Sequence, residues 1–273
     1  MRGRLSFLGV WSWAVYGFVL APIVVILLAS LTAAEYTSFP PQGLSLRWYL
    51  EIPRHPEFLE SLWISLVVAV VSGTLATALG TPAALALVRY RFRGRELLNG
   101  FFLSPLMLPA VILGVALLQF YTRAGITRTP LALVCGHLVI TVPYVVRLVS
   151  ASLAGMDPSL ERAALILGAT PWKAFTRVTL PLVAPGVIAG AAFATIVSFD
   201  DVSIALFLAS PKTTTLPVRI FTYIEQTFDP LVTAVCSLLV LLTAAAVIVI
   251  ERSVGLGRLF GTEEAATPAA RSR

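Results

Sequence analysis

Two adjacent aspartates, Asp200 and Asp201, are the residues best suited to chemistry in this chain of 273 residues. They lie in the apolar stretch ATIVSFDDVSIALFL, and one carboxylate in hydrocarbon costs roughly 2.5 to 3.5 kcal/mol. Such acids usually face a cavity, an opposite charge or water, so the pair is a candidate lining for a cation path. Alternatively, a helix ends near Phe199 and the acids cap the next segment. The residues alone leave both interpretations open, and since helical neighbours point about 100° apart, at most one acid, Asp200 by preference, should face a path.

Other sets of chemically active residues do not occur in the sequence. The stretch GATPWKA, which begins at Gly168, lacks the second glycine and the hydroxyl residue of a GxxxxGK[ST] phosphate loop. The two histidines, His55 and His137, and the two cysteines, Cys135 and Cys236, are scattered, and no metal-ligand or catalytic-triad spacing joins them. We therefore predict no metal site and no catalytic residue, and we expect a neighbouring helix to satisfy His137.

The composition is that of a membrane protein. The chain is 58% hydrophobic and only 12% charged, its mean hydropathy is +0.88, and several apolar runs exceed the ~18 residues that mark a membrane helix. Its net charge of +6 comes from residues in short connections between apolar runs. That distribution reports membrane topology, so no nucleic-acid partner is expected.

Six apolar segments are long enough to cross a membrane, which predicts an all-α, polytopic fold. Pro105 and Pro109 interrupt the third segment and Pro143 lies in the fourth, which is tolerated where neighbouring helices satisfy the freed carbonyls. The first segment is longer than the apolar core of a signal peptide, so an uncleaved anchor is favoured. The six expected spans are approximately residues 10–33, 61–88, 100–120, 131–153, 186–208 and 231–250.

The basic residues predict the orientation of the chain. With the N-terminus inside, fourteen Lys and Arg fall on the inner side and six on the outer side, out of 20. Because inner loops of membrane proteins are enriched in Lys and Arg, both termini are expected to be cytoplasmic in a cell inner membrane. The loop that begins at Asp157 falls on the same side.

That loop, Asp157 to Gly186, should contain short helices of its own. Asp157 can accept from the free N–H groups of a first turn, and Pro158 suits the first helical position. Glu161 lies at the positive end of the helix dipole, and Gly168 should end this helix.

A second short helix should follow at once. Thr170 is its expected cap and Pro171 its first residue. It should run through WKAFTRVTL and stop at Pro181. With no further information, the two helices could be an amphipathic surface pair without a partner.

The run ERAALILGA, with LP at residues 180–181 and PG at 185–186, resembles the EAA loop of permease subunits of type I binding-protein-dependent ABC importers. In that family the first helix of the loop docks into a cleft of a separate cytoplasmic ATPase. Small residues at Ala163 and Ala164 would let a partner approach closely. Arg162 occupies the family's acidic position, and the acid, Glu161, comes one residue earlier. Charge reversal of Glu161 is therefore expected to impair transport less than a substitution of Gly168 or a bulky residue at Ala164. The resemblance assigns coupling to Glu161, Arg162, Ala163, Ala164, Gly168 and Pro181.

The pattern SFDDVSIALFLASPKTTTLPVRIF, followed by FDPLVTAVCSLLVLL, resembles the second permease of spermidine/putrescine importers, and the resemblance extends over most of the chain from Ser61. It implies a six-span permease that translocates polyamines delivered by an external binding protein. The permease would pair with a second, homologous permease and with two ATPase subunits, which would bind the ATP and Mg, so this chain needs no cofactor. Permeases for other small solutes belong to the same branch and remain an alternative.

The expected organisation has three parts: residues 1–60 form a span and an external loop, residues 61–251 form the transmembrane domain with a cytoplasmic coupling loop at 154–185, and residues 252–273 form a disordered tail. The rival function is an ion-driven secondary transporter, in which Asp200 and Asp201 would bind protons or cations. It predicts inverted repeats with acids in corresponding spans, and the first half of the chain has none. A third candidate function, that of a membrane enzyme, is disfavoured because the sequence lacks a recognisable set of catalytic residues.

Overall fold

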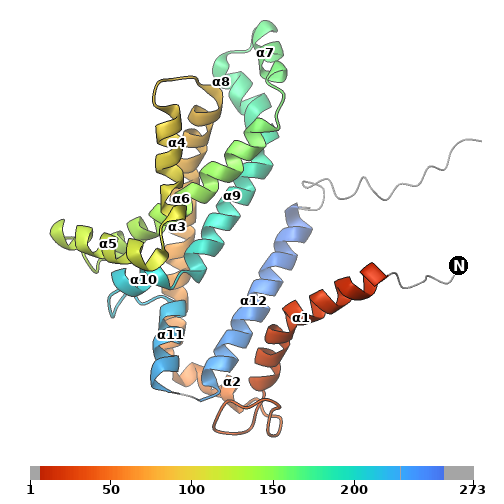
Figure 1. Ribbon diagram of the computed structural model, residues 1–273, viewed down its shortest axis with the longest axis vertical. Helices are drawn as coiled ribbons and strands as arrows, with labels where there is room; N and C mark the ends of the chain where they lie inside the picture. Colours follow the sequence, from red (N-terminus) through yellow and green to blue (C-terminus); the bar gives the residue numbers. More distant parts are fainter. Residues whose placement is uncertain (1–6, 228, 255–273) are drawn as a thin grey trace, which may run out of the picture. The chain divides into compact units, whose positions relative to one another are not determined.

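The computed structural model describes residues 7–227 and 229–254, and the regular structure in these residues is helical (Figure 1). The chain divides into two compact units. One comprises the residues up to Pro56 together with those from Tyr223 onward, and the other is Glu57–Thr222. The second unit holds the loop and the acids singled out above.

The first unit is built on two long helices, α1 (Phe7–Ala29) and α12 (Leu231–Val254), which contact each other. The short helices α2 (Arg47–Glu51) and η1 (Ile52–Arg54) follow α1, and α2 contacts α12. The Tyr49 hydroxyl lies 2.6 Å from both the Ser30 and the Ser237 hydroxyl oxygens. This chain of hydroxyls satisfies polar groups that would otherwise be costly to bury.

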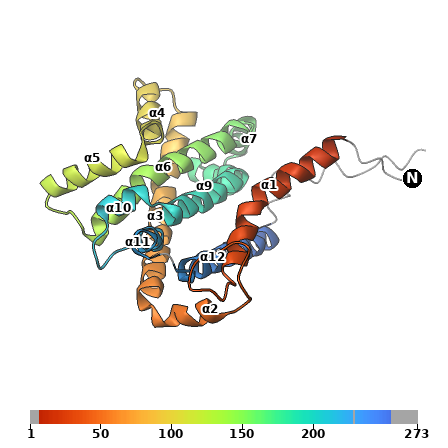
Figure 2. The same cartoon turned by 60° about the horizontal axis from the view of Figure 1, so that its bottom comes forward.

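In the second unit α6 (Pro130–Ala154) and α9 (Leu180–Asp200) lie side by side over much of their length (Figures 1 and 2). Helix α3 (Pro56–Arg89) packs against both. Small residues allow this approach: a Cβ atom on Gly186 of α9 would overlap the Ser152 side chain of α6. A Cβ on Gly80 of α3 would lie 2.8 Å from Val145 of α6. The other helices of this unit are α4 (Arg95–Leu103), η2 (Ser104–Met107), α5 (Ala110–Arg123), α7 (Ser159–Ile166), α8 (Pro171–Ala174), η3 (Phe175–Thr179), α10 (Ser203–Leu208) and the first part of α11 (Leu216–Gln226), which continues into the first unit at Tyr223.

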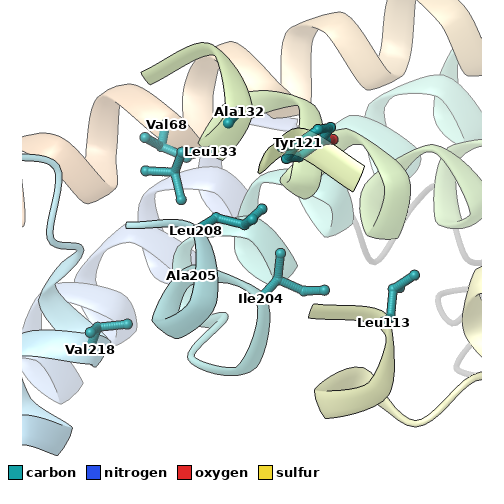
Figure 3. Close-up of a cluster of buried hydrophobic side chains, with 9 residues drawn as sticks. All are labelled: Val68, Leu113, Tyr121, Ala132, Leu133, Ile204, Ala205, Leu208 and Val218. Atoms are coloured by element: carbon teal, nitrogen blue, oxygen red, sulfur yellow. The ribbon is translucent and has the colours of Figure 1, made fainter. Parts of the chain in front are cut away.

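A cluster of buried apolar side chains joins five helices of this unit (Figure 3). Leu133 of α6 and Leu208 of α10 are fully buried in it. Gly136 leaves room for α10, because a Cβ there would overlap Leu208. The cluster consists of Val68, Leu113, Tyr121, Ala132, Leu133, Ile204, Ala205, Leu208 and Val218.

The structure confirms the all-α, polytopic class. Four helical segments are long and apolar enough to cross a membrane: Gly9–Ala29, Pro56–Arg89, Pro130–Ala154 and Pro171–Asp200. The third expected span is instead a bent pair, in which Arg95–Met107 and Ala110–Arg123 meet at 108°. α12 is apolar over Leu231–Ala245. The count of six spans therefore stays a prediction.

Several expected boundaries were wrong. The first helix ends at Ala29 instead of residue 33, and the second long helix begins at Pro56, five residues early. The fifth expected span is divided, because α9 ends at Asp200 and α10 is a separate helix. Of the expected tail, the first three residues continue α12 to Val254, and residues 255–273 lie outside the described part of the chain.

Pro181 does not stop a helix, contrary to the sequence prediction. The η3 segment is a π-helical turn, and at its end the Leu180 N–H donates to the Phe175 carbonyl. This wider turn leads directly into α9 and leaves Pro181 in the first turn of that helix, where a missing N–H costs little. The helical path consequently continues from Pro171 to Asp200.

Candidate functional site

The Asp157 side chain binds the first N–H of α7, as the sequence predicts, but the helix begins at Ser159, one residue later than expected, with Pro158 as its N-cap residue. The Asp157 carboxylate accepts a 2.8 Å hydrogen bond from the Ser159 N–H. This bond holds the pKa of Asp157 below its usual value. Since the lowered pKa belongs to the folded state, the stabilisation is present at neutral pH and is lost as the pH falls through the folded pKa.

The end of α7 is a left-handed glycine cap. Gly168 has φ of +87°, a conformation that glycine adopts without strain. Its N–H donates to the Leu165 carbonyl, and the Ala169 N–H donates to the Ala164 carbonyl, both at 3.0 Å. This pair of bonds is the Schellman arrangement, so the predicted helix end at Gly168 is confirmed.

The second helix of the loop also begins at the expected residues. The Thr170 hydroxyl accepts from the Lys173 N–H at 3.3 Å, and Pro171 is the first helical residue. From there α8, η3 and α9 form one helical path. A displacement of the loop would therefore be transmitted to the Asp200 end of α9 through continuous helix.

Glu161 lies at the centre of a polar contact among three segments. Its Oε2 forms an ion pair with Arg89 at the end of α3 and accepts a 2.9 Å hydrogen bond from the Thr179 hydroxyl of η3. The Arg89 guanidinium also donates to the Thr179 hydroxyl at 3.0 Å. Both charged side chains are only 22% exposed. The acid thus ties α7 to α3 and to the π turn, and its shift by one position along the sequence does not leave it without a partner.

The opposite face of α7 is open. Arg162, Ala163, Ile166 and Leu167 lie at helical spacing on one face, and all four are exposed. Ile166 is 85% exposed and Leu167 is 87% exposed, although both side chains are apolar. None of the residues of α7 is buried by the described part of the chain, and in Figure 1 α7 lies beyond the ends of α6 and α9. A face of this kind is typical of a docking surface.

The two aspartates have different surroundings. One carboxylate oxygen of Asp201 accepts from the Ile204 and Ala205 N–H groups, at 3.0 and 2.8 Å, and so caps α10. The capping interpretation is therefore confirmed for Asp201. Asp200 is the last residue of α9, is exposed, and forms no hydrogen bond or ion pair through its side chain with the described residues. Of the two acids, Asp200 has the carboxylate free to meet a cation.

His137 lies close to this helix break. It is fully buried in α6, and its Nδ1 is 2.8 Å from the Ser198 hydroxyl, two residues before Asp200. The expectation that a neighbouring helix satisfies His137 is confirmed for this ring nitrogen, whereas Nε2 has no hydrogen-bond partner in the part of the chain that the structure describes. Within the described residues, no three His, Cys, Asp or Glu side chains gather as metal ligands, and Cys135 and Cys236 are both free.

Sequence reasoning missed Arg89 and Thr179 as site residues. Arg89 was visible only as one of four arginines that close a span, and Thr179 only as part of a short helix. No local pattern pairs them, because each lies in a different segment from Glu161. The six predicted coupling residues do share one region, with Pro181 two residues beyond Thr179.

An all-α membrane chain, with an exposed two-helix loop joined directly to a long span, has the architecture of a transport permease. Comparison with known proteins identifies the family. The chain belongs to the binding-protein-dependent transport system inner membrane components, which it matches over residues 76–255. It is therefore a multi-pass membrane subunit of an ABC transport system and is a transport component, not an enzyme.

Curated relatives match most of the chain. The spermidine/putrescine transport system permease protein PotC of Escherichia coli is 31% identical over 91% of this chain and 93% of its own length. The putrescine transport system permease protein PotI of Escherichia coli is 34% identical over 82% of both chains. The sulfate transport system permease protein CysT of the same organism is 28% identical over 72% of this chain and 76% of its own.

Solved structures show the same fold. A bacterial ABC transporter involved in the import of the acidic polysaccharide alginate matches with a TM-score of 0.64 and 16% identity, over 93% of this chain and 98% of that one. The MetNI methionine ABC transporter matches with a TM-score of 0.62 and 22% identity, over 74% and 96%. At these identities the likeness concerns the fold alone.

Proposed function

We propose that this chain is the permease subunit of an ATP-driven importer that translocates polyamines delivered by an external binding protein. The observation that carries the proposal is the similarity to PotC and PotI over 82% or more of the chain. The match to the sulfate permease CysT has lower identity and coverage. Import of another small solute is the second candidate, because one family includes permeases for cations and anions.

The charge at the helix break supports a cationic substrate. A polyamine carries several ammonium groups, and a carboxylate in an apolar region attracts a cation more strongly than it would in water. The Asp200 side chain has no partner among the described residues, whereas one Asp201 oxygen is engaged in capping α10. In the proposed path Asp200 contacts the substrate and Asp201 maintains the break.

The loop supports coupling to a separate ATPase. Its exposed apolar face would dock into a cleft of the ATPase, with Ala163 allowing close approach, while Ala164 lies on the half-buried side. Gly168 ends the docking helix, and Pro181 lies at the start of the span that the loop would move. ATP and Mg would bind to the ATPase subunits. Closure of two such subunits would displace α7 and, through the π turn, α9.

The proposed assembly contains this chain, a second homologous permease, two ABC ATPase subunits and an external binding protein, within membrane lipid. Both chain termini and the α7 loop would face the cytoplasm. The Arg89–Glu161 ion pair supports this side, because it brings the arginine-rich end of α3 to the same end of the unit as α7. Four arginines, Arg89, Arg91, Arg93 and Arg95, follow within seven residues there.

Uptake into proteoliposomes that contain the assembled complex tests the proposal. Labelled spermidine or putrescine should accumulate only when ATP reaches the ATPase side and the binding protein is present outside. Sulfate serves as the control solute. Accumulation driven by an imposed proton or sodium gradient without ATP would refute the proposal in favour of a secondary transporter, and ATP-driven uptake of sulfate alone would refute the substrate class.

A further inference from the structure

Glu161 and Arg162 are neighbouring charged residues of α7, and their side chains have different surroundings. Glu161 and Ala164 are half-buried on the side of the helix that faces the rest of the unit. The Glu161 carboxylate is already engaged there by Arg89 and Thr179. Both contacts are made by Oε2 and come from this chain, so the charge of Glu161 is already paired within the unit.

Arg162 is on the exposed side of the same helix. It forms no ion pair within the described residues, although its charge helps to lower the pKa of Asp157. Its neighbours on this face are Ala163 and the strongly exposed Ile166 and Leu167. This face of α7 is therefore apolar and carries one positive charge, that of Arg162.

We propose that Arg162 recognises an acidic side chain in the cleft of the partner ATPase, and that Glu161 is a positioning residue that holds α7 for that contact. The inference rests on the proposed coupling to an ATPase and adds the chemistry of the partner's surface. The cleft must offer an apolar wall to Ile166 and Leu167 and a carboxylate to Arg162.

The charge requirement follows from desolvation. When the face docks, Arg162 loses water, and a buried charge without a partner is strongly unfavourable. A guanidinium has a planar set of N–H donors that matches a carboxylate in a bidentate contact. An acid opposite Arg162 would therefore select this ATPase and would disfavour ATPases that carry a basic residue at that point.

The test measures binding of the purified ATPase subunit to the permease assembly in nanodiscs, with Arg162→Glu, Arg162→Lys and Arg162→Gln. Arg162→Glu should weaken binding by at least about thirtyfold, as expected for a disrupted interfacial charge pair, and Arg162→Lys should weaken it less. Arg162→Gln should also reduce the salt dependence of binding. An ATPase variant with Lys in place of the facing acid should bind the Arg162→Glu permease better than the original permease.

Arg123→Glu is the matched control, because Arg123 is an exposed arginine at the end of α5 and should leave ATPase binding unchanged. If the unmodified permease binds the ATPase and transports, but Arg162→Glu binds as well as Arg123→Glu, the inference is overturned and the proposed function stands. If the unmodified assembly binds no ATPase at all, both are overturned.

The positioning role of Glu161 has its own measurement, the amount of substrate transported per ATP hydrolysed. Glu161→Gln should lower this ratio several-fold while the ATPase stays bound, since the docking face is intact and its attachment to α3 is weakened. A swap of the pair, Glu161→Arg with Arg89→Glu, should restore part of the ratio that Glu161→Arg alone loses. An unchanged ratio in Glu161→Arg would refute the positioning role.

Discussion

Replacing Gly168 by valine should uncouple the loop from transport. The φ of +87° at this position is costly for any residue with a Cβ atom. A Cβ placed there would meet no other atom within 4 Å, so the cost is conformational and not a clash. An L-residue in the left-handed region loses about 1 to 2 kcal/mol, and a β-branched residue is at the upper end.

This free-energy cost lowers the fraction of molecules in which α7 ends correctly at Gly168. A loss of about 1 to 2 kcal/mol changes an equilibrium by a factor of roughly 5 to 30. The chain would relieve the strain by unwinding the last turn of α7, which carries Ile166 and Leu167 of the docking face. We therefore expect ATP-driven uptake to fall by up to that factor, while the protein still inserts into the membrane.

The assay is initial uptake in proteoliposomes, normalised to the amount of assembled complex. Gly168→Asn is the matched control, because asparagine tolerates the left-handed region and should retain most activity. Gly168→Asp shares this tolerance and should lie between the two. Uptake by Gly168→Val at the unmodified rate and abundance would refute the reasoning.

Three further predictions concern the acids, the helix packing and the nucleotide. Asp200→Asn should lower uptake of spermidine while Asp201→Asn is nearly normal, because Asn still caps α10; unchanged uptake when both are replaced would refute the path. Gly186→Val should lower the thermal midpoint of the purified complex, with about 1 to 3 kcal/mol lost to overpacking against α6, whereas Gly100→Val, with open space around it, should change it little; equal midpoints would contradict the packing account. The purified chain alone should not hydrolyse ATP, and phosphate release without an added ATPase would contradict this.

The local features of the site could be predicted from the sequence, since each depends on residues within one helical turn. Asp157 and Thr170 cap because their side chains reach N–H groups two or three residues ahead. Gly168 ends α7 because glycine alone enters the left-handed region freely. The long apolar runs likewise predicted the helical class.

Features that depend on contacts between segments could not be predicted in this way. The Arg89–Glu161 ion pair joins residues 72 positions apart and follows only from the packing of α3 against the loop. The hydrogen bond between His137 and Ser198 likewise joins two helices. The predicted helix end at Pro181 was wrong, because the π-helical turn before it lets the helical path continue past a residue type that usually ends a helix. In the third expected span, Pro109 lies in a break whose 108° angle no local rule supplies.

The central claim is that the exposed face of α7 contacts an ATPase, and site-directed cross-linking tests it most directly. A cysteine at Ile166, in a complex whose native cysteines have been replaced, should cross-link to the ATPase subunit, with a yield that changes when ATP is added. A cysteine at Leu97, an exposed position on α4, is the control for nonspecific reaction. If a transport-competent complex gives no cross-link from Ile166 to the ATPase in any nucleotide state, the account is contradicted.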